Sequence, residues 1–118
     1  MKQAFVHSAE LVLDTDADPA APGGAVTIAL CGSWDHEGAC KWPHHTQVEP
    51  LEGRSRVRVV FVAESSDEAD IRSQIDGALA GGSCTGPDGR KSQWSVVNSG
   101  AGTLTEEEVG MSERMAIV

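Results

Sequence analysis

Apolar and polar residues alternate with a period of two in four segments of the chain, which predicts four β-strands. We expect these strands at residues 5–13, 25–31, 55–63 and 93–98. The third segment is the richest in β-branched residues, so it is predicted to be central in the sheet. In the last segment, Trp94 and Val96 are expected to face the core. Residues 14–24 contain two prolines and a Gly-Gly pair and predict a loop.

Two further segments carry the start signals of α-helices. Ser65 and Glu68 have the spacing of a capping box, in which each residue bonds to the backbone of the other. Apolar residues follow on one helical face, and the pair at 81–82 supplies glycine for a left-handed stop. A second capping box at 105–108 predicts a last helix over 106–115.

The order strand, strand, strand, helix, strand, helix predicts the fold class. We expect a single α+β domain over residues 1–118, with one four-stranded mixed sheet and two helices packed on one face. A chain of this length can bury a core without disulfides or metal ions, and it has no room for a second full domain.

Composition narrows the range of partners and compartments. The 118 residues include 18 acidic and 9 basic side chains, a formal net charge of -9. Duplex binding depends on clustered Lys and Arg, so this charge argues against nucleic acid as a partner. The sequence has neither the apolar run of a membrane helix nor a signal-peptide pattern, and we expect a cytoplasmic protein without a membrane role. Three cysteines favour reduced thiols, and the residue usage is typical of high-GC bacteria.

One segment suggests chemistry, because two of the three cysteines and three of the four histidines fall within residues 31–45. The spacing is C-x4-H-x3-C-x3-H. Thiolate and imidazole are preferred ligands of zinc and do not suit calcium or magnesium. We predict a metal site, zinc before copper or iron, with His45 as a substitute for one of four ligands: Cys31, His36, Cys40 and His44.

The expected loop over about 32–53 needs a reason to exist, since structureless segments of this length are rare in compact domains unless they are functional or tied down. A metal ion would supply that reason. The C-x2-C pair of most zinc sites is missing, however, so a purely structural or interface loop is the alternative. Trp34 and Trp42 would then anchor a homodimer that covers the open face of the sheet, without metal or catalysis.

A second alternative is a cysteine- or zinc-dependent hydrolase. The run from His36 to Cys40 differs by one residue from the zinc-peptidase pattern H-E-x-x-H, but Gly38 and Pro43 oppose the helix that this pattern requires. A nucleophilic Cys40 would need a nearby cation, and the adjacent side chains are carboxylates. We therefore assign no catalytic residue and no organic cofactor.

Two smaller features lie on the predicted strands. His7 lies on the apolar face of the first strand and is expected to be a hydrogen-bonded core residue rather than a metal ligand. The third strand carries three basic residues on its polar face, and these either bind an anion or pair with carboxylates such as Glu10 and Asp14 of the first strand. In so acidic a protein we favour pairing for all three, Arg54, Arg56 and Arg58.

Overall fold

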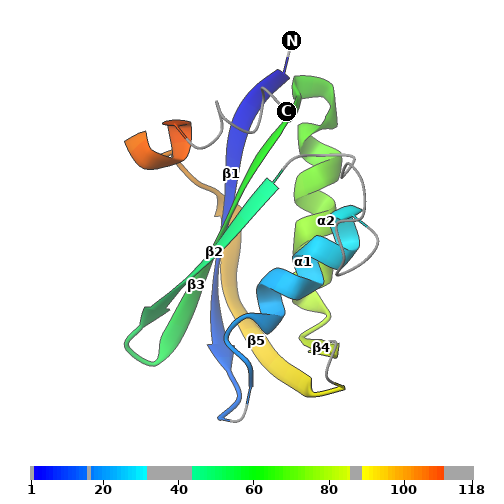
Figure 1. Ribbon diagram of the computed structural model, residues 1–118, viewed down its shortest axis with the longest axis vertical. Coiled ribbons are helices and arrows are strands. Elements are labelled where there is room, and N and C mark those ends of the chain that lie inside the picture. The colour runs from blue at the N-terminus through cyan, green and yellow to red at the C-terminus, as the bar shows by residue number, and fades with distance from the viewer. Residues whose placement is uncertain (1, 16, 32–43, 86–88, 111–118) are drawn as a thin grey trace.

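The computed structural model describes residues 2–15, 17–31, 44–85 and 89–110. Figure 1 shows the elements in order, with two helices beside a strongly curled sheet. Their bounds are β1 Lys2–Leu13, α1 Ala21–Cys31, β2 His44–Leu51, β3 Arg54–Glu64, the 3-10 turn η1 Ser65–Asp67, α2 Glu68–Ala80, β4 Ser83–Thr85 and β5 Lys91–Ala101. Residues 106–110 form a short additional helix.

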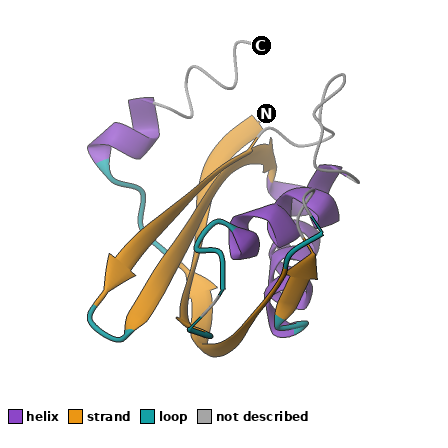
Figure 2. Ribbon diagram, turned by 60° about the horizontal axis from the view of Figure 1, so that its bottom comes forward, coloured by secondary structure: helices purple, strands orange, loops and turns teal. Residues whose placement is uncertain are grey.

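The sheet has five strands in the order β2-β3-β1-β5-β4, and every neighbouring pair is antiparallel. The α+β class is therefore confirmed, while the four-stranded mixed sheet is wrong. Without β4, the elements follow the order β-α-β-β-α-β with β1 and β3 central, which is the split βαβ arrangement of ferredoxin-like folds. Both α1 and α2 lie on one face of the sheet, and the helix at 106–110 lies on the other side (Figure 2). The prediction that α2 and this last helix share one face is therefore wrong, because α1, which was predicted as a strand, takes that place beside α2.

The strand predicted at 25–31 is wrong, because this segment belongs to α1, which begins at Ala21. The side chains of Val26 and Leu30 are buried, with exposed fractions of 0 % and 4 %. Their spacing of four residues fits a helix as well as a strand. Ile28 decides between the two periods, because it is 37 % exposed where a strand would bury it. Pro22 is tolerated in the first helical turn, whose N–H groups have no partner within the helix.

Two strands were not predicted. β2 lies within the expected loop, and its side chains are either exposed or only half-buried, which leaves little apolar alternation to detect. β4 has only three residues, too few to show an alternating pattern. Both are the edges of the sheet, where one side of the backbone needs no partner strand.

α2 is confirmed, with a different start. The helix begins at Glu68 after η1, and neither element has a side-chain cap, so the capping box at Ser65 is wrong. The glycine stop is confirmed at Gly82, whose φ is 70°. A Cβ at this position would lie 3.0 Å from the carbonyl oxygen of Trp94. Both the positive φ and this close approach therefore favour glycine at position 82.

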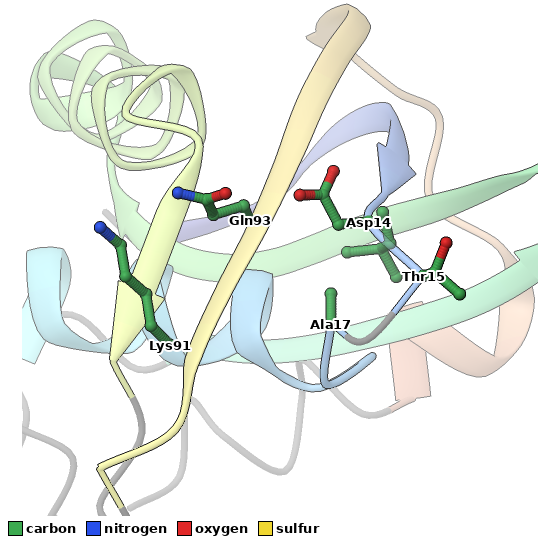
Figure 3. Close-up of a pocket in the computed structure, with 6 residues that line it drawn as sticks. Asp14, Thr15, Ala17, Lys91 and Gln93 are labelled. Carbon is green, nitrogen blue, oxygen red and sulfur yellow. The ribbon is translucent and has the colours of Figure 1, made fainter.

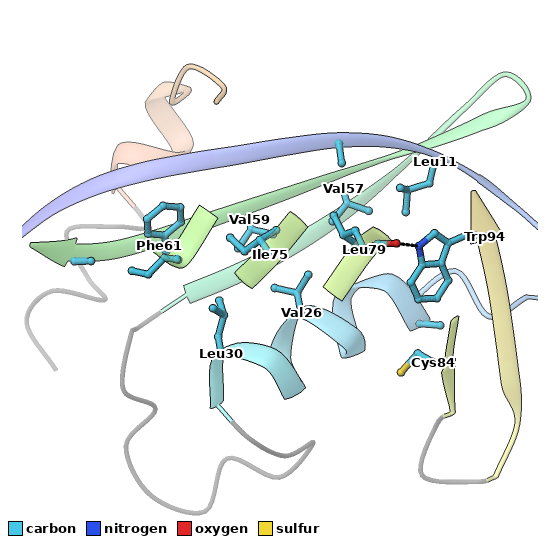
Figure 4. Close-up of a cluster of buried hydrophobic side chains, with 14 residues drawn as sticks. Leu11, Val26, Leu30, Val57, Val59, Phe61, Ile75, Leu79, Cys84 and Trp94 are labelled. Atoms are coloured by element: carbon cyan, nitrogen blue, oxygen red, sulfur yellow. Dashed lines mark hydrogen bonds between the residues drawn. The ribbon is translucent and has the colours of Figure 1, made fainter. Parts of the chain in front are cut away.

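The core lies between the sheet and the two helices, as Figure 4 shows. β1 and β3 supply alternate residues such as Leu11 and Phe61, and α2 supplies Ile71, Ile75 and Leu79. Trp94 closes one end of the core, and its indole Nε1 donates a buried hydrogen bond of 2.9 Å to the carbonyl oxygen of Leu79 (Figure 4).

Val96 is 38 % exposed, so its predicted place in the core is wrong. The pairing of β1 with β5 shifts register between Glu10 and Leu11, and the regular burial of alternate β5 residues ends near this point. None of the helices in the described part of the chain has the length and apolar character needed to cross a membrane.

Candidate functional site

The predicted metal ligands lie at the α1–β2 connection, and the structure describes only its two ends. The backbone of Cys31 ends α1, and His44 is the first residue of β2. His36 and Cys40 lie outside the described residues, as do Trp34 and Trp42. Among the residues that are described, no group of three His, Cys, Asp or Glu side chains is arranged to hold a metal ion.

His44 faces α1 across the inner side of the sheet. Its Nε2 lies 3.5 Å from the hydroxyl oxygen of Thr27, a long hydrogen bond at best. Thr27 and Cys31 are four residues apart, so they occupy the same face of the helix in successive turns. The two ends of the α1–β2 connection, at residue 31 and at His44, are therefore near each other. Strand alternation turns the exposed His45 to the opposite face, which makes it a poor substitute ligand.

A cavity of about 320 Å³ opens beside His44, between the start of α1 and β2. Gly23 allows the close approach of the two elements, because a Cβ there would lie 3.2 Å from Cγ2 of Thr46. The hydroxyl oxygen of Thr46 is buried and has no hydrogen-bond partner among the residues that the structure describes. Leaving such a group unpaired costs about 1–3 kcal/mol. Among the described residues, this part of the sheet edge therefore holds a buried polar group whose hydrogen bonding is not satisfied.

His7 is confirmed as a hydrogen-bonded core residue, 3 % exposed. An arginine can only donate, so Nδ1 accepts from Arg72 at 3.1 Å, and the neutral ring donates through Nε2 to Asp76 at 2.7 Å. Burial tends to raise the pKa of Asp76, but hydrogen bonds from His7 and Ser99 outweigh it and hold this pKa below its ordinary value. Both ring nitrogens of His7 form hydrogen bonds with residues of α2, so His7 links α2 to β1. Neither nitrogen is free for acid-base catalysis.

The arginines of β3 form ion pairs, as predicted. Arg54 and Arg56 reach the carboxylate of Glu10 at 3.0 and 3.4 Å, and hydrogen bonds from both lower the pKa of Glu10. Among the described ion pairs, Asp14 pairs with none of these arginines, and Arg58 pairs with a carboxylate outside β1. Arg58, the third arginine on this face of β3, has a partner that was not predicted from the sequence.

That partner is Glu108, which is 3 % exposed in the last described helix. Arg58 donates to both of its carboxylate oxygens at 2.7 and 2.9 Å and to the carbonyl oxygen of Thr103 at 2.8 Å. The predicted second capping box is also confirmed, because Thr105 N–H donates to Glu108 Oε1 at 2.9 Å and Glu108 N–H donates to the Thr105 hydroxyl at 3.2 Å. The hydrogen bonds from Arg58 lower the pKa of Glu108 against the opposing effect of burial.

A larger cavity, about 660 Å³, lies where β1 ends and β5 begins (Figure 3). Asp14 and Thr15 follow β1, and Lys91 and Gln93 come from β5 (Figure 3). All four of these side chains are exposed to solvent. Volume alone does not make this depression a functional site.

Comparison with known proteins finds no family model that matches the chain, no significantly similar curated protein and no significantly similar solved structure. Function must therefore be argued from the residues themselves.

Proposed function

We propose that this protein binds a transition-metal ion, zinc first, through the thiolates of Cys31 and Cys40 and the imidazoles of His36 and His44. The spacing of these four residues within one connection is the basis of the proposal. Four protein donors fill the tetrahedral coordination of zinc, and closed sites of this kind are structural. The proposed role is accordingly binding and stabilisation, and a hydrolase would need a coordination position left open.

The structural observation that supports this proposal is the contact of 3.5 Å between Thr27 Oγ1 and His44 Nε2. One helical turn is about 5.4 Å long, so the helix end at Cys31 lies close to the start of β2. The twelve residues between the two ends carry the other two donors. The excess of carboxylates in the chain further favours a bound cation.

The test is elemental analysis of protein expressed without a histidine tag, since a tag adds ligands of its own. We expect about one equivalent of metal, zinc in zinc-supplemented cultures, and a higher thermal midpoint for the loaded form. Less than about a tenth of an equivalent of any transition metal, unchanged after zinc is added, would overturn the proposal.

Matched variants locate the site. Cys40→Ser and His44→Ala should each lower metal content and abolish the metal-dependent rise in melting temperature. Cys84→Ala and His45→Ala should leave both unchanged. Burial raises the pKa of the Cys84 thiol and disfavours the thiolate that a metal needs, while His45 faces away from α1. Equal losses in all four variants would contradict the assignment.

The competing proposal is a metal-free homodimer in which Trp34 and Trp42 cover the open face of the sheet. The part of that face that is described already carries the ion pairs of Glu10 and the segment held by Arg58, which weakens the need for a cover. Replacement of both tryptophans by alanine separates the two proposals, because it should abolish a dimer in light scattering only if their indoles form the interface.

A further inference from the structure

β2 is an edge strand, and over residues 45–51 its outer backbone side has no partner among the described residues. It pairs with β3 on one side only, over eight residues from His44 to Leu51. For residues 45–51 the described hydrogen bonds of the backbone are those of this single ladder. Exposed edges of this length offer unpaired N–H and C=O groups to another strand, and most natural edges are shorter or protected. The opposite edge, β4, has only three residues.

Pro50 indicates which backbone groups face outward. A proline within an edge strand turns its nitrogen away from the neighbouring strand, because it has no N–H to donate. Backbone direction alternates along a strand, so Thr46 and Val48 share this orientation and present their N–H and C=O groups to the open side. These two residues can form hydrogen-bonded pairs with an added antiparallel strand.

The side chains of β2 match those of a second, antiparallel β2. With Gln47 opposite Gln47 of the other copy, Thr46 lies opposite Val48, and His45 lies opposite Glu49. His45, Gln47 and Glu49 are all exposed and share the outer face. Each His45–Glu49 pair occurs twice by symmetry, and imidazole and carboxylate are complementary in hydrogen bonding and in charge.

We propose that β2 pairs with β2 of a second copy of this chain, in antiparallel register about Gln47, so that two five-stranded sheets join into one. Arg56 already approaches Glu49 at 3.7 Å, so an added His45 would extend this ion pair across the two-fold axis. A strand edge of eight residues is small for an interface, and a reversible dimer in the micromolar range is expected. This interface is distinct from the metal site and uses neither tryptophan of the α1–β2 connection.

Sedimentation velocity at about 1–500 µM is the primary test, and a concentration-dependent shift from monomer to dimer is expected. His45→Glu places a carboxylate opposite Glu49 and should weaken the dimer about tenfold or more, because an attractive pair becomes repulsive at two symmetric places. His45→Glu combined with Glu49→Lys restores opposite charges and should recover dimerisation. Glu52→Lys, which changes charge by the same amount as Glu49→Lys but lies in the β2–β3 turn, is the control for net charge.

Each outcome decides the matter. A protein that stays monomeric at 500 µM, about the top of the range tested, would overturn the proposal. A dimer that survives His45→Glu, or one that is lost only when Trp34 and Trp42 are replaced, would place the interface elsewhere. His45→Glu changes an exposed side chain, so an unaltered circular dichroism spectrum and unaltered metal content will show that a lost dimer does not reflect a lost fold.

Discussion

Glu108→Gln tests how the C-terminal segment is held against the outer face of the sheet. The substitution keeps the shape of the side chain and removes its charge. Glu108 is 3 % exposed and Arg58 is 20 % exposed, so this pair is far better shielded from water than the pairs of Glu10 with Arg54 and Arg56. The amide also turns a donor toward the guanidinium, where a carboxylate oxygen now accepts.

The expected cost follows from these contacts. A hydrogen bond to a charged partner contributes about 1.5–3 kcal/mol, and removal of one member of a fully buried ion pair costs about 3–5 kcal/mol. Arg58 keeps its bond to the carbonyl oxygen of Thr103 and some exposure to water, which reduces the second figure. We therefore expect a loss of about 2–3 kcal/mol in the free energy of unfolding. Glu107→Gln, an exposed change in the same helical turn, should cost less than about 0.5 kcal/mol.

Urea unfolding followed by tryptophan fluorescence gives these values, because Trp94 is buried and reports on the core. The pH dependence is a second check. The pKa of Glu108 is lowered in the folded protein, so its contribution is present above the ordinary carboxyl pKa and is lost as the pH falls through the lowered one. The difference between wild type and Glu108→Gln should shrink in that acidic range. A cost at neutral pH that equals the cost of Glu107→Gln would refute the reasoning.

Two other predictions concern single side chains. Gly77→Ala should stabilise the protein by about 0.5–1 kcal/mol, because Gly77 is exposed within α2 and a Cβ meets nothing within 4 Å, whereas Gly82→Ala should destabilise it by more than 1 kcal/mol, since the backbone there has φ 70°. Thermal or urea unfolding measures both, and a destabilising Gly77→Ala or a neutral Gly82→Ala would contradict the local geometry. Thr46→Val should raise the free energy of unfolding by about 1 kcal/mol, because it removes a buried hydroxyl without a partner, and a loss of stability would mean that this hydroxyl is bonded.

Local signals account for the parts of the fold that the sequence predicted. The β-branched run of β3, the one-face apolar spacing of α2 and the capping box at Thr105 each arise from residues a few positions apart. α1 was not predicted because the spacing of Val26 and Leu30 fits both the helical period and the strand period. Only the packing against the sheet shows that Ile28 faces outward. β2 was not predicted because an edge strand without fully buried side chains shows almost no apolar pattern in the sequence.

The same limit applies to the candidate site. The pairing of Arg54 and Arg56 with Glu10 could be predicted because neighbouring antiparallel strands bring polar faces together. Arg58 and Glu108 are fifty residues apart, and no local pattern links a strand to the capping residue of a distant helix. The Cys/His cluster could be found from its density alone, but spacing does not say whether four donors converge on one point.

The central position of β1 has a consequence for how the chain acquires its structure during synthesis. β1 is made before both of its neighbours, and it pairs with Ser55–Glu64 on one side and with Trp94–Ala101 on the other. In a nascent chain on the ribosome, one hydrogen-bonding edge of β1 therefore stays open until β3 has emerged, and the other stays open until β5 has emerged. Such distant pairings slow folding and prolong the exposure of unpaired strand edges, and unpaired edges favour aggregation of a newly made chain.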